Sequence, residues 1–157
     1  MDIYTYLHKD HLKVSKLFKE ITASKNQEER VKLFLEVKKE LELHADPEND
    51  TFYKALEKKP KGKEDSEHGA HEHQEIKKAL KTISKISPDN ESEWLINLGK
   101  LMHIVEHHVE EEESEMFEDG KKIISDKQAQ VLAEEMESLK EKIRSSKKFK
   151  ETYGEEI

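Results

Sequence analysis

The chain has 157 residues, of which 41% are charged and 33% hydrophobic, and this length suits one domain with a core of its own. Its 28 basic and 36 acidic side chains give a net charge of -8, which argues against nucleic acid as a partner, because phosphate binding needs a basic surface. The absence of cysteine excludes disulfides and thiolate metal sites, and the lack of a signal peptide or a long apolar run predicts a cytoplasmic protein without a membrane partner.

The residue types that dominate the chain predict an all-α fold. Glu, Lys, Leu and Ala are good helix formers, only 5 Gly and 3 Pro interrupt them, and no run of alternating β-branched residues indicates a strand. Long helices joined by short loops favour an up-down-up-down four-helix bundle. We expect this bundle over residues 1–122, and an additional C-terminal helix with a charged tail over residues 123–157 that packs on the bundle or extends from it.

In chain order, the first helix is predicted over about residues 3–22, where apolar side chains recur on one face. Asn26 and Glu29 resemble a capping box that opens a long second helix, whose apolar periodicity continues to Leu56. Pro47 lies inside this second helix. It is expected to kink the helix at the preceding residue, because proline cannot donate the hydrogen bond that an interior residue normally makes.

Three further elements complete the predicted chain. A lysine-rich connection over residues 58–63 precedes a third helix over about residues 65–86. The fourth helix runs from about residue 92 to Gly120, a natural C-terminal cap. A fifth helix spans about residues 126–145 and has a frayed, highly charged end. Its apolar residues expected to pack on the bundle are Val131, Met136, Leu139 and Ile143.

The direction in which each polar side chain points follows from helix geometry, since successive residues advance by about 100° around the axis. On the fourth helix, Leu101 and Val105 mark the interior stripe. His108 and Glu112 fall within this stripe, one turn apart, whereas His107 points away from it. The fourth helix therefore presents an inward-facing His-x-x-x-Glu pair.

The other three helices also present inward-facing histidines. His44 and Glu48 repeat the His-x-x-x-Glu pattern on the second helix, and the first and third helices contribute His11 and His73. The candidate metal-ligating residues are His11, His44, Glu48, His73, His108 and Glu112. The histidines expected at the surface are His8, His68, His71, His103 and His107.

A single His-x-x-x-Glu pair on a charged helix is usually a solvent-exposed ion pair. Six inward-facing nitrogen and oxygen donors in one core are different, because buried imidazoles and carboxylates are costly without partners. Nitrogen and oxygen ligands without sulfur suit iron, zinc or manganese, and bridging carboxylates are typical of two-metal sites in helix bundles. The pattern therefore predicts a metal site in the core.

Four segments of the sequence resemble the hemerythrin-like, or HHE cation-binding, domain family, whose members carry these motifs in the same order. The segments are Lys9-Asp10-His11, Leu43-His44-Ala45 with Glu48 and Phe52-Tyr53, Glu72-His73-Gln74-Glu75-Ile76, and Val105-Glu106-His107-His108-Val109 with the acids up to Glu113 before Met116-Phe117. The resemblance covers about residues 1–120. It implies the same four-helix bundle and two non-haem iron ions with an oxo or hydroxo bridge.

The resemblance also implies a role for each candidate ligand: His11 and His44 on one iron, His73 and His108 on the other, and Glu48 and Glu112 as bridges. Oxygen-carrying members have a second histidine on the third helix, one turn from the first, where this sequence has Gly69 and Lys77. We therefore expect either a water molecule at an open position or Glu72 as a replacement ligand. Glu111 is the most plausible ligand after these.

Three functions are consistent with the sequence. The leading hypothesis is a diiron-binding protein that senses, stores or detoxifies oxygen, peroxide, nitric oxide or iron, with metal ions and a small diatomic or peroxide ligand as its partners. The second is a diiron oxidase or peroxidase, since an open iron position allows dioxygen or peroxide to be activated. The third is a metal-free helical interaction module whose histidines form a polar network. The sequence does not indicate an oligomeric state.

Overall fold

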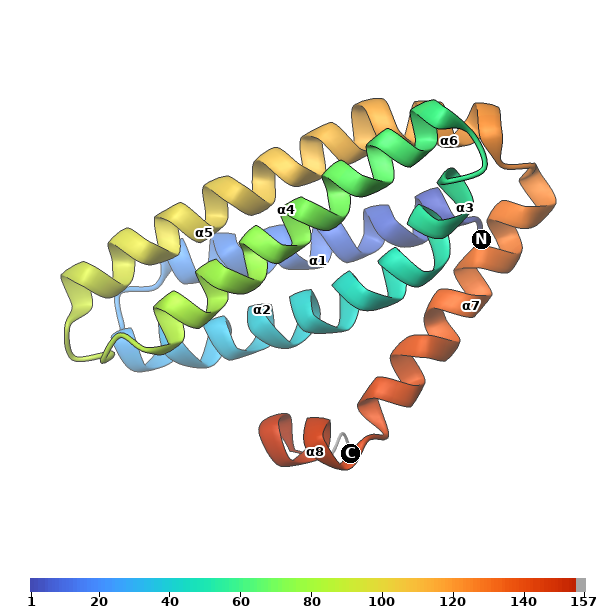
Figure 1. Ribbon diagram of the computed structural model, residues 1–157. Helices are drawn as coiled ribbons and strands as arrows, with labels where there is room; N and C mark the ends of the chain where they lie inside the picture. Colours follow the sequence, from blue (N-terminus) through green and yellow to red (C-terminus); the bar gives the residue numbers. More distant parts are fainter. Residues whose placement is uncertain (155–157) are drawn as a thin grey trace.

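A computed structural model describes residues 1–154, and the regular secondary structure in this part of the chain is helical throughout. Four long helices lie side by side (Figure 1): α1 (Ile3–Ala23), α2 (Gln27–Glu48), α4 (Pro60–Ser84) and α5 (Glu91–Glu111). In Figure 1 each of these helices runs back along the one before it. The prediction of an all-α protein is thus confirmed. Residues 155–157 of the expected charged tail lie outside the described residues.

Two of the long helices continue through a π-helical segment. α2 is followed by η1 (Asn49–Tyr53) and α3 (Lys54–Leu56), and α5 is followed by η2 (Glu112–Met116) and α6 (Phe117–Ile123). The second and fourth predicted helices each combine these three elements. Each π segment begins at or next to the glutamate of a His-x-x-x-Glu pair, which is typical of π turns at functional sites.

The helix ends confirm some sequence predictions and correct others. Asn26 caps α2 as expected, because its Oδ1 accepts a hydrogen bond from the amide of Glu29 at 3.1 Å. α4 begins at Pro60, five residues before the predicted start, since proline suits the first position of a helix. Gly120 does not end its helix but lies inside α6. A Cβ atom there would lie 2.9 Å from the hydroxyl of Tyr4, so glycine permits this close approach.

Pro47 lies inside α2, as the sequence requires, and is buried. The helix continues without interruption through Pro47 to Glu48. The hydroxyl of Thr51 donates to the carbonyl of Pro47 at 2.7 Å, which satisfies that carbonyl within the following π segment. The proline therefore leaves the stacking of His44 and Glu48 intact, with 3.0 Å between Nε2 and Oε1.

The interior has two apolar clusters, and the candidate ligands lie between them. One cluster is formed around Leu7, Phe52 and Met116, and the other includes Val14 and Val105. On α1 the buried residues change from the first cluster to the second at His11. α2 and α5 contribute to the second cluster, and the π segments that follow them contribute to the first. The fold thus sandwiches a polar layer between two apolar layers, which shields that layer from water at both ends.

The C-terminal region adds two helices outside the four-helix bundle. α7 (Asp126–Arg144) packs on α1 and α2, with Met136 fully buried, and diverges from the bundle toward its end (Figure 1). Val131 is 40% exposed, so its predicted packing role is wrong, and its neighbour Leu132 is buried instead. The predicted frayed end is also wrong, because α8 (Lys147–Tyr153) follows, capped by Ser146. No helix within residues 1–154 has the length and apolar character needed to cross a membrane.

Candidate metal centre

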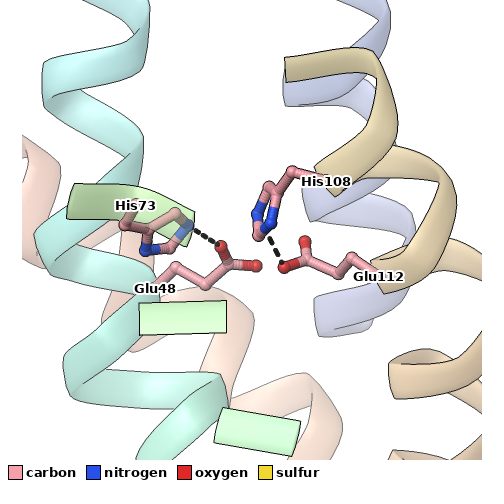
Figure 2. Close-up of side chains that lie close together, drawn as sticks. All are labelled: Glu48, His73, His108 and Glu112. Carbon is pink, nitrogen blue, oxygen red and sulfur yellow. Dashed lines mark ion pairs between the residues drawn. The ribbon is translucent and has the colours of Figure 1, made fainter. Parts of the chain in front are cut away.

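The structure brings all six predicted ligands into the polar layer. They come from four helices and one π segment: His11 on α1, His44 and Glu48 on α2, His73 on α4, His108 on α5 and Glu112 at the start of η2. All six are buried, and the two glutamates have no exposed surface. Figure 2 shows the carboxylates of Glu48 and Glu112 facing each other between His73 and His108. The inward direction of each side chain is therefore as the helical periodicity predicted.

Each glutamate lies between two histidines. Oε1 of Glu48 is 3.0 Å from Nε2 of His44 and 3.0 Å from Nε2 of His73. Oε1 of Glu112 is 3.1 Å from Nε2 of His11, and its Oε2 is 3.4 Å from Nε2 of His108. The two oxygens of Glu112 thus point to histidines on two different helices, α1 and α5.

The other ring nitrogen of every inward histidine is held by a fixed oxygen. The pairs are His11 Nδ1 with Glu113 at 2.5 Å, His44 Nδ1 with Asp10 at 2.9 Å, His73 Nδ1 with Asn49 at 2.9 Å, and His108 Nδ1 with Glu72 at 2.8 Å. Carboxylate and amide oxygens accept hydrogen bonds, so each Nδ1 carries a proton and donates. All four Nε2 atoms are consequently free to bind a cation, which is the arrangement found around metal-ligating histidines.

The inner atoms of this layer do not satisfy one another. Among the described residues, Nε2 of His11, His44 and His73, both oxygens of Glu48 and Oε1 of Glu112 are buried without a hydrogen-bond partner. In the neutral imidazoles the Nε2 lone pairs face the lone pairs of the carboxylates, which is repulsive at about 3 Å. A metal ion between these atoms removes the repulsion and satisfies every donor. The residues present therefore fit a metal centre.

The pKa values of His11, His44 and His108 are raised by the carboxylates around them, whereas burial lowers that of His73. Burial lowers the pKa of His108, but hydrogen bonds to Glu112 and Glu72 outweigh burial and raise that pKa to about 10. Burial likewise lowers the pKa of His44, and the facing Glu48 and Asp10 raise it well above its usual value. A layer that draws in protons in this way has the negative potential that a cation requires.

Tyr53 is a member of the site that the periodicity missed. Its ring stacks on His73, with 5.2 Å between centroids and 14° between planes. Its hydroxyl donates to Oε2 of Glu112 and lies 3.5 Å from Nε2 of His108. Burial and the negative charge of Glu112 raise the pKa of Tyr53 well above 10, so this phenol keeps its proton when no metal is bound.

The same tyrosine occupies the position of the missing histidine. A Cβ atom on Gly69, one turn before His73, would lie 2.6 Å from the hydroxyl of Tyr53. The space that a histidine at position 69 would need is thus filled by the phenol ring. The available signal in the sequence was a glycine in the middle of a helix, which often marks a close approach of another side chain.

Two carboxylates that were considered as replacement ligands have other contacts. Glu72 does not enter the layer, since its Oε1 accepts from Nδ1 of His108. Glu111 lies outside the layer, where His68 and His107 contact its two oxygens. All five histidines expected at the surface are exposed.

A narrow cavity of about 30 Å³ opens beside the metal centre. All four inward histidines line it, together with apolar side chains such as Val14, Leu41, Ile76, Leu80 and Val105. This volume is that of about one water molecule. The cavity therefore offers room for a small molecule next to the four histidines.

Comparison with known proteins gives three matches. The hemerythrin HHE cation binding domain family matches residues 2–119. The crystal structure of a hemerythrin HHE cation binding domain-containing protein from Mycobacterium kansasii has a TM-score of 0.83 and 27% identity, and the match covers 98% of this chain and 94% of that one. A DNA nickase from Nostoc sp. is 31% identical over 144 residues, which are 92% of this chain but 40% of the nickase.

The family match covers the four helices, both π segments and all six candidate ligands. The structural match extends over α7 and α8 as well, because it covers nearly the whole chain. Sequence, fold and the buried His/Glu layer thus lead to one assignment: this chain belongs to the hemerythrin HHE cation-binding domain family.

Proposed function

We propose that this chain binds two non-haem iron ions in the polar layer and uses them to react with dioxygen, peroxide or nitric oxide. The observation that carries the proposal is the convergence of four imidazole nitrogens and two carboxylates, all buried, most of whose inner atoms lack other partners among the described residues. His11 and His44 would hold one ion, and His73 and His108 the other. Glu48 and Glu112 lie between the two pairs.

The grouping of the ligand atoms supports two ions rather than one. One group contains His11, His44 and Glu112, and the other contains Glu48, His73, His108 and Glu112, with the atoms of each group within 4.8 Å of one another. Glu112 belongs to both groups. A carboxylate shared between two sets of histidines is the usual means by which helix bundles hold a pair of metal ions.

Metal analysis of variants tests this proposal. We expect about two iron ions per chain in protein from iron-supplied cells, and a large loss of iron in His44→Ala and Glu48→Ala. His71→Ala and His103→Ala are the matched controls, because these histidines are exposed and lie outside the polar layer. The proposed centre would be disproved if the wild-type protein contained no iron, or if all four variants lost iron equally. Protein that contained zinc alone would also disprove it, because zinc accepts the same ligands as iron.

The cavity supports a small ligand as the reaction partner. Its volume of about 30 Å³ has room for dioxygen, peroxide or nitric oxide. Its lining combines apolar side chains and the four histidines with the charged residues Asp10, Glu40, Glu42 and Lys77. Bound iron would supply the redox chemistry and an open coordination position for that ligand. The residues of the chain would exclude bulk water, fix each Nε2 and provide a proton at the hydroxyl of Tyr53.

Tyr53 favours reaction over reversible oxygen carriage. Release of dioxygen unchanged competes with its reduction, and a proton donor beside an iron centre favours reduction. Here the hydroxyl of Tyr53 contacts Glu112 inside the layer. We predict that the anaerobically reduced protein oxidises in air within minutes to a stable diferric form. Stopped-flow absorption spectra after mixing with oxygen measure this, and a spectrum that reverts under vacuum after hours would identify a carrier instead.

The DNA-nicking activity named for the Nostoc relative belongs to a protein of which this chain spans 40%. The net charge of -8 opposes binding of nucleic acid by this chain, because neutralising phosphates needs clustered lysine and arginine. The function that we propose is therefore one in the cytoplasm that involves metal ions and a small ligand, without nucleic acid or membrane.

A further inference from the structure

Two further His-x-x-x-Glu pairs meet on the outer surface where α4 and α5 pack together. His68 and Glu72 are one turn apart on α4, and His107 and Glu111 are one turn apart on α5. Nε2 of His68 lies 2.8 Å from Oε2 of Glu111 and 3.5 Å from Oε2 of Glu72. Nε2 of His107 lies 3.1 Å from the other oxygen of Glu111.

These contacts differ from an ordinary surface ion pair. One ligand atom each from His68, Glu72 and Glu111 lies within 4.8 Å of the others, although the residues come from two helices. The two carboxylates attract a positive charge, and Nε2 of His68 lies between them as a ligand atom shared by both helices. By contrast, the pair of His71 and Glu75, at 2.9 Å, is formed within α4 alone.

We propose that His68, Glu72 and Glu111, flanked by His107, form an outer site for one divalent transition-metal ion, separate from the buried centre. Imidazole nitrogen with carboxylate oxygen is a donor set that Zn²⁺, Fe²⁺ and Mn²⁺ accept. His68 and His107 are 56% and 57% exposed, so water completes the coordination and the ion exchanges with solvent. The outer site therefore binds more weakly than the buried centre.

Glu72 connects the outer site to the buried centre. Its Oε1 accepts from Nδ1 of His108, while its Oε2 faces His68. The hydrogen bond to His108 holds the carboxylate in place, which pre-organises one ligand of the outer site at no further entropic cost. This arrangement distinguishes the outer site from a cluster of mobile surface acids.

Calorimetric titration of the full-length, iron-loaded protein with Zn²⁺ tests the outer site. We expect one additional Zn²⁺ per chain, and a loss of affinity of about tenfold or more in His68→Ala, in line with the removal of one ligand. His71→Ala is the matched control, since it also removes an exposed α4 histidine that faces a glutamate one turn away. Its affinity for the additional Zn²⁺ should equal that of the wild type.

The measurement compares the Zn²⁺ affinity of the outer site in the wild type with that in His68→Ala. This comparison does not depend on which metal fills the buried centre. If the buried centre failed to bind iron, the iron content of the protein would be low, but the wild type and His68→Ala would still differ in their affinity for Zn²⁺ at the outer site. The proposal is overturned if the wild type takes up no Zn²⁺ beyond that in the buried centre, or if His68→Ala and His71→Ala behave alike. Titration with Co²⁺ gives a second readout, because ligation by His68 changes its visible absorption spectrum.

Discussion

Tyr53 shows how a single side chain changes the chemistry that the metal ligands allow. The six ligands alone resemble those of an oxygen carrier that lacks one histidine. The phenol adds a hydrogen-bond donor that contacts Glu112, which belongs to both groups of ligand atoms. It also stacks on His73 and thereby fixes the plane of that imidazole. One tyrosine therefore supports two ligands and supplies a proton donor beside the proposed metal ions.

Replacing Tyr53 by phenylalanine tests this role. Tyr53→Phe keeps the ring that packs on Gly69 and His73 but leaves a buried oxygen of Glu112 without its donor, which costs about 1–3 kcal/mol. We expect the variant to fold, and its affinity for the metal to fall by about tenfold, as for other groups that orient metal ligands. Competition with a chelator, followed by absorption of the released iron, measures the change.

Tyr4→Phe is the control for this experiment. Tyr4 is also buried, and its hydroxyl has no hydrogen-bond partner among the described residues. Its removal should leave metal affinity unchanged. Equal effects of the two substitutions would mean that Tyr53 acts only through packing.

The inward direction of the six candidate ligands could be predicted from the sequence because each lies within an uninterrupted α-helix, or one residue beyond it, where the angular step of about 100° holds. Tyr53 could not, because it lies at the end of η1. A π turn contains more residues than an α turn, so residues beyond it face a different direction from the one that α-helical periodicity predicts.

At the level of the elements, the π segments could not be foreseen. Both segments begin at or next to the glutamate of a His-x-x-x-Glu pair, but that pair also occurs within α4 without a π turn, and neither proline nor glycine marks η2. α8 was missed because charged residues surround its one buried side chain, Phe149. The π segments and α8 depend on contacts with other helices, and a single sequence does not show these contacts.

α7 lies outside the family match but reaches the metal centre through a buried ion pair. Nζ of Lys140 lies 2.6 Å from Asp10, whose carboxylate accepts from Nδ1 of His44. Burial raises the pKa of Asp10, but the contacts with His44 and Lys140 outweigh it and lower that pKa to about 2. α7 therefore keeps ionised the carboxylate that orients one proposed ligand.

Loss of the positive charge of Lys140 should destabilise the fold. We expect Lys140→Met to lower the free energy of unfolding by about 3 kcal/mol, because removing one partner of a buried ion pair leaves the other poorly compensated. Urea denaturation of the metal-free protein measures the change. Lys142→Met is the control, since Lys142 is exposed on the same helix. Similar losses in both variants would show that the contact of Lys140 with Asp10 contributes little.

At the level of the whole molecule, the centre joins two helical hairpins that contribute equally. The hairpin of α1 and α2 supplies two histidines and one glutamate, and the hairpin of α4 and α5, with the start of η2, supplies the same set. The pairing of these helices followed from the long apolar stripes and short loops of the sequence. The sequence also predicted that a C-terminal helix could pack on the bundle, and Met136 of α7 is buried there, but it did not predict α8, whose buried residue is Phe149.

Removal of the metal should therefore loosen the contact between the two hairpins. Ligands from separate hairpins are not assembled in the unfolded chain, so metal binding stabilises the native state alone. Two ions at about 100 times their dissociation constants would together add about 5 kcal/mol. We expect the melting temperature to fall by about 10 °C or more when a chelator removes the metal, as measured by calorimetry. An unchanged melting temperature would argue against a centre in the core.

The close approach of Tyr53 to Gly69 has a consequence for the evolution of the family. The phenol ring fills the space that any larger residue at position 69 would need, because a Cβ atom there would lie 2.6 Å from the ring. A histidine at position 69 would therefore require the phenol ring of Tyr53 to move. We expect that relatives with histidine at position 69 have a smaller side chain at position 53, or a tyrosine that points elsewhere.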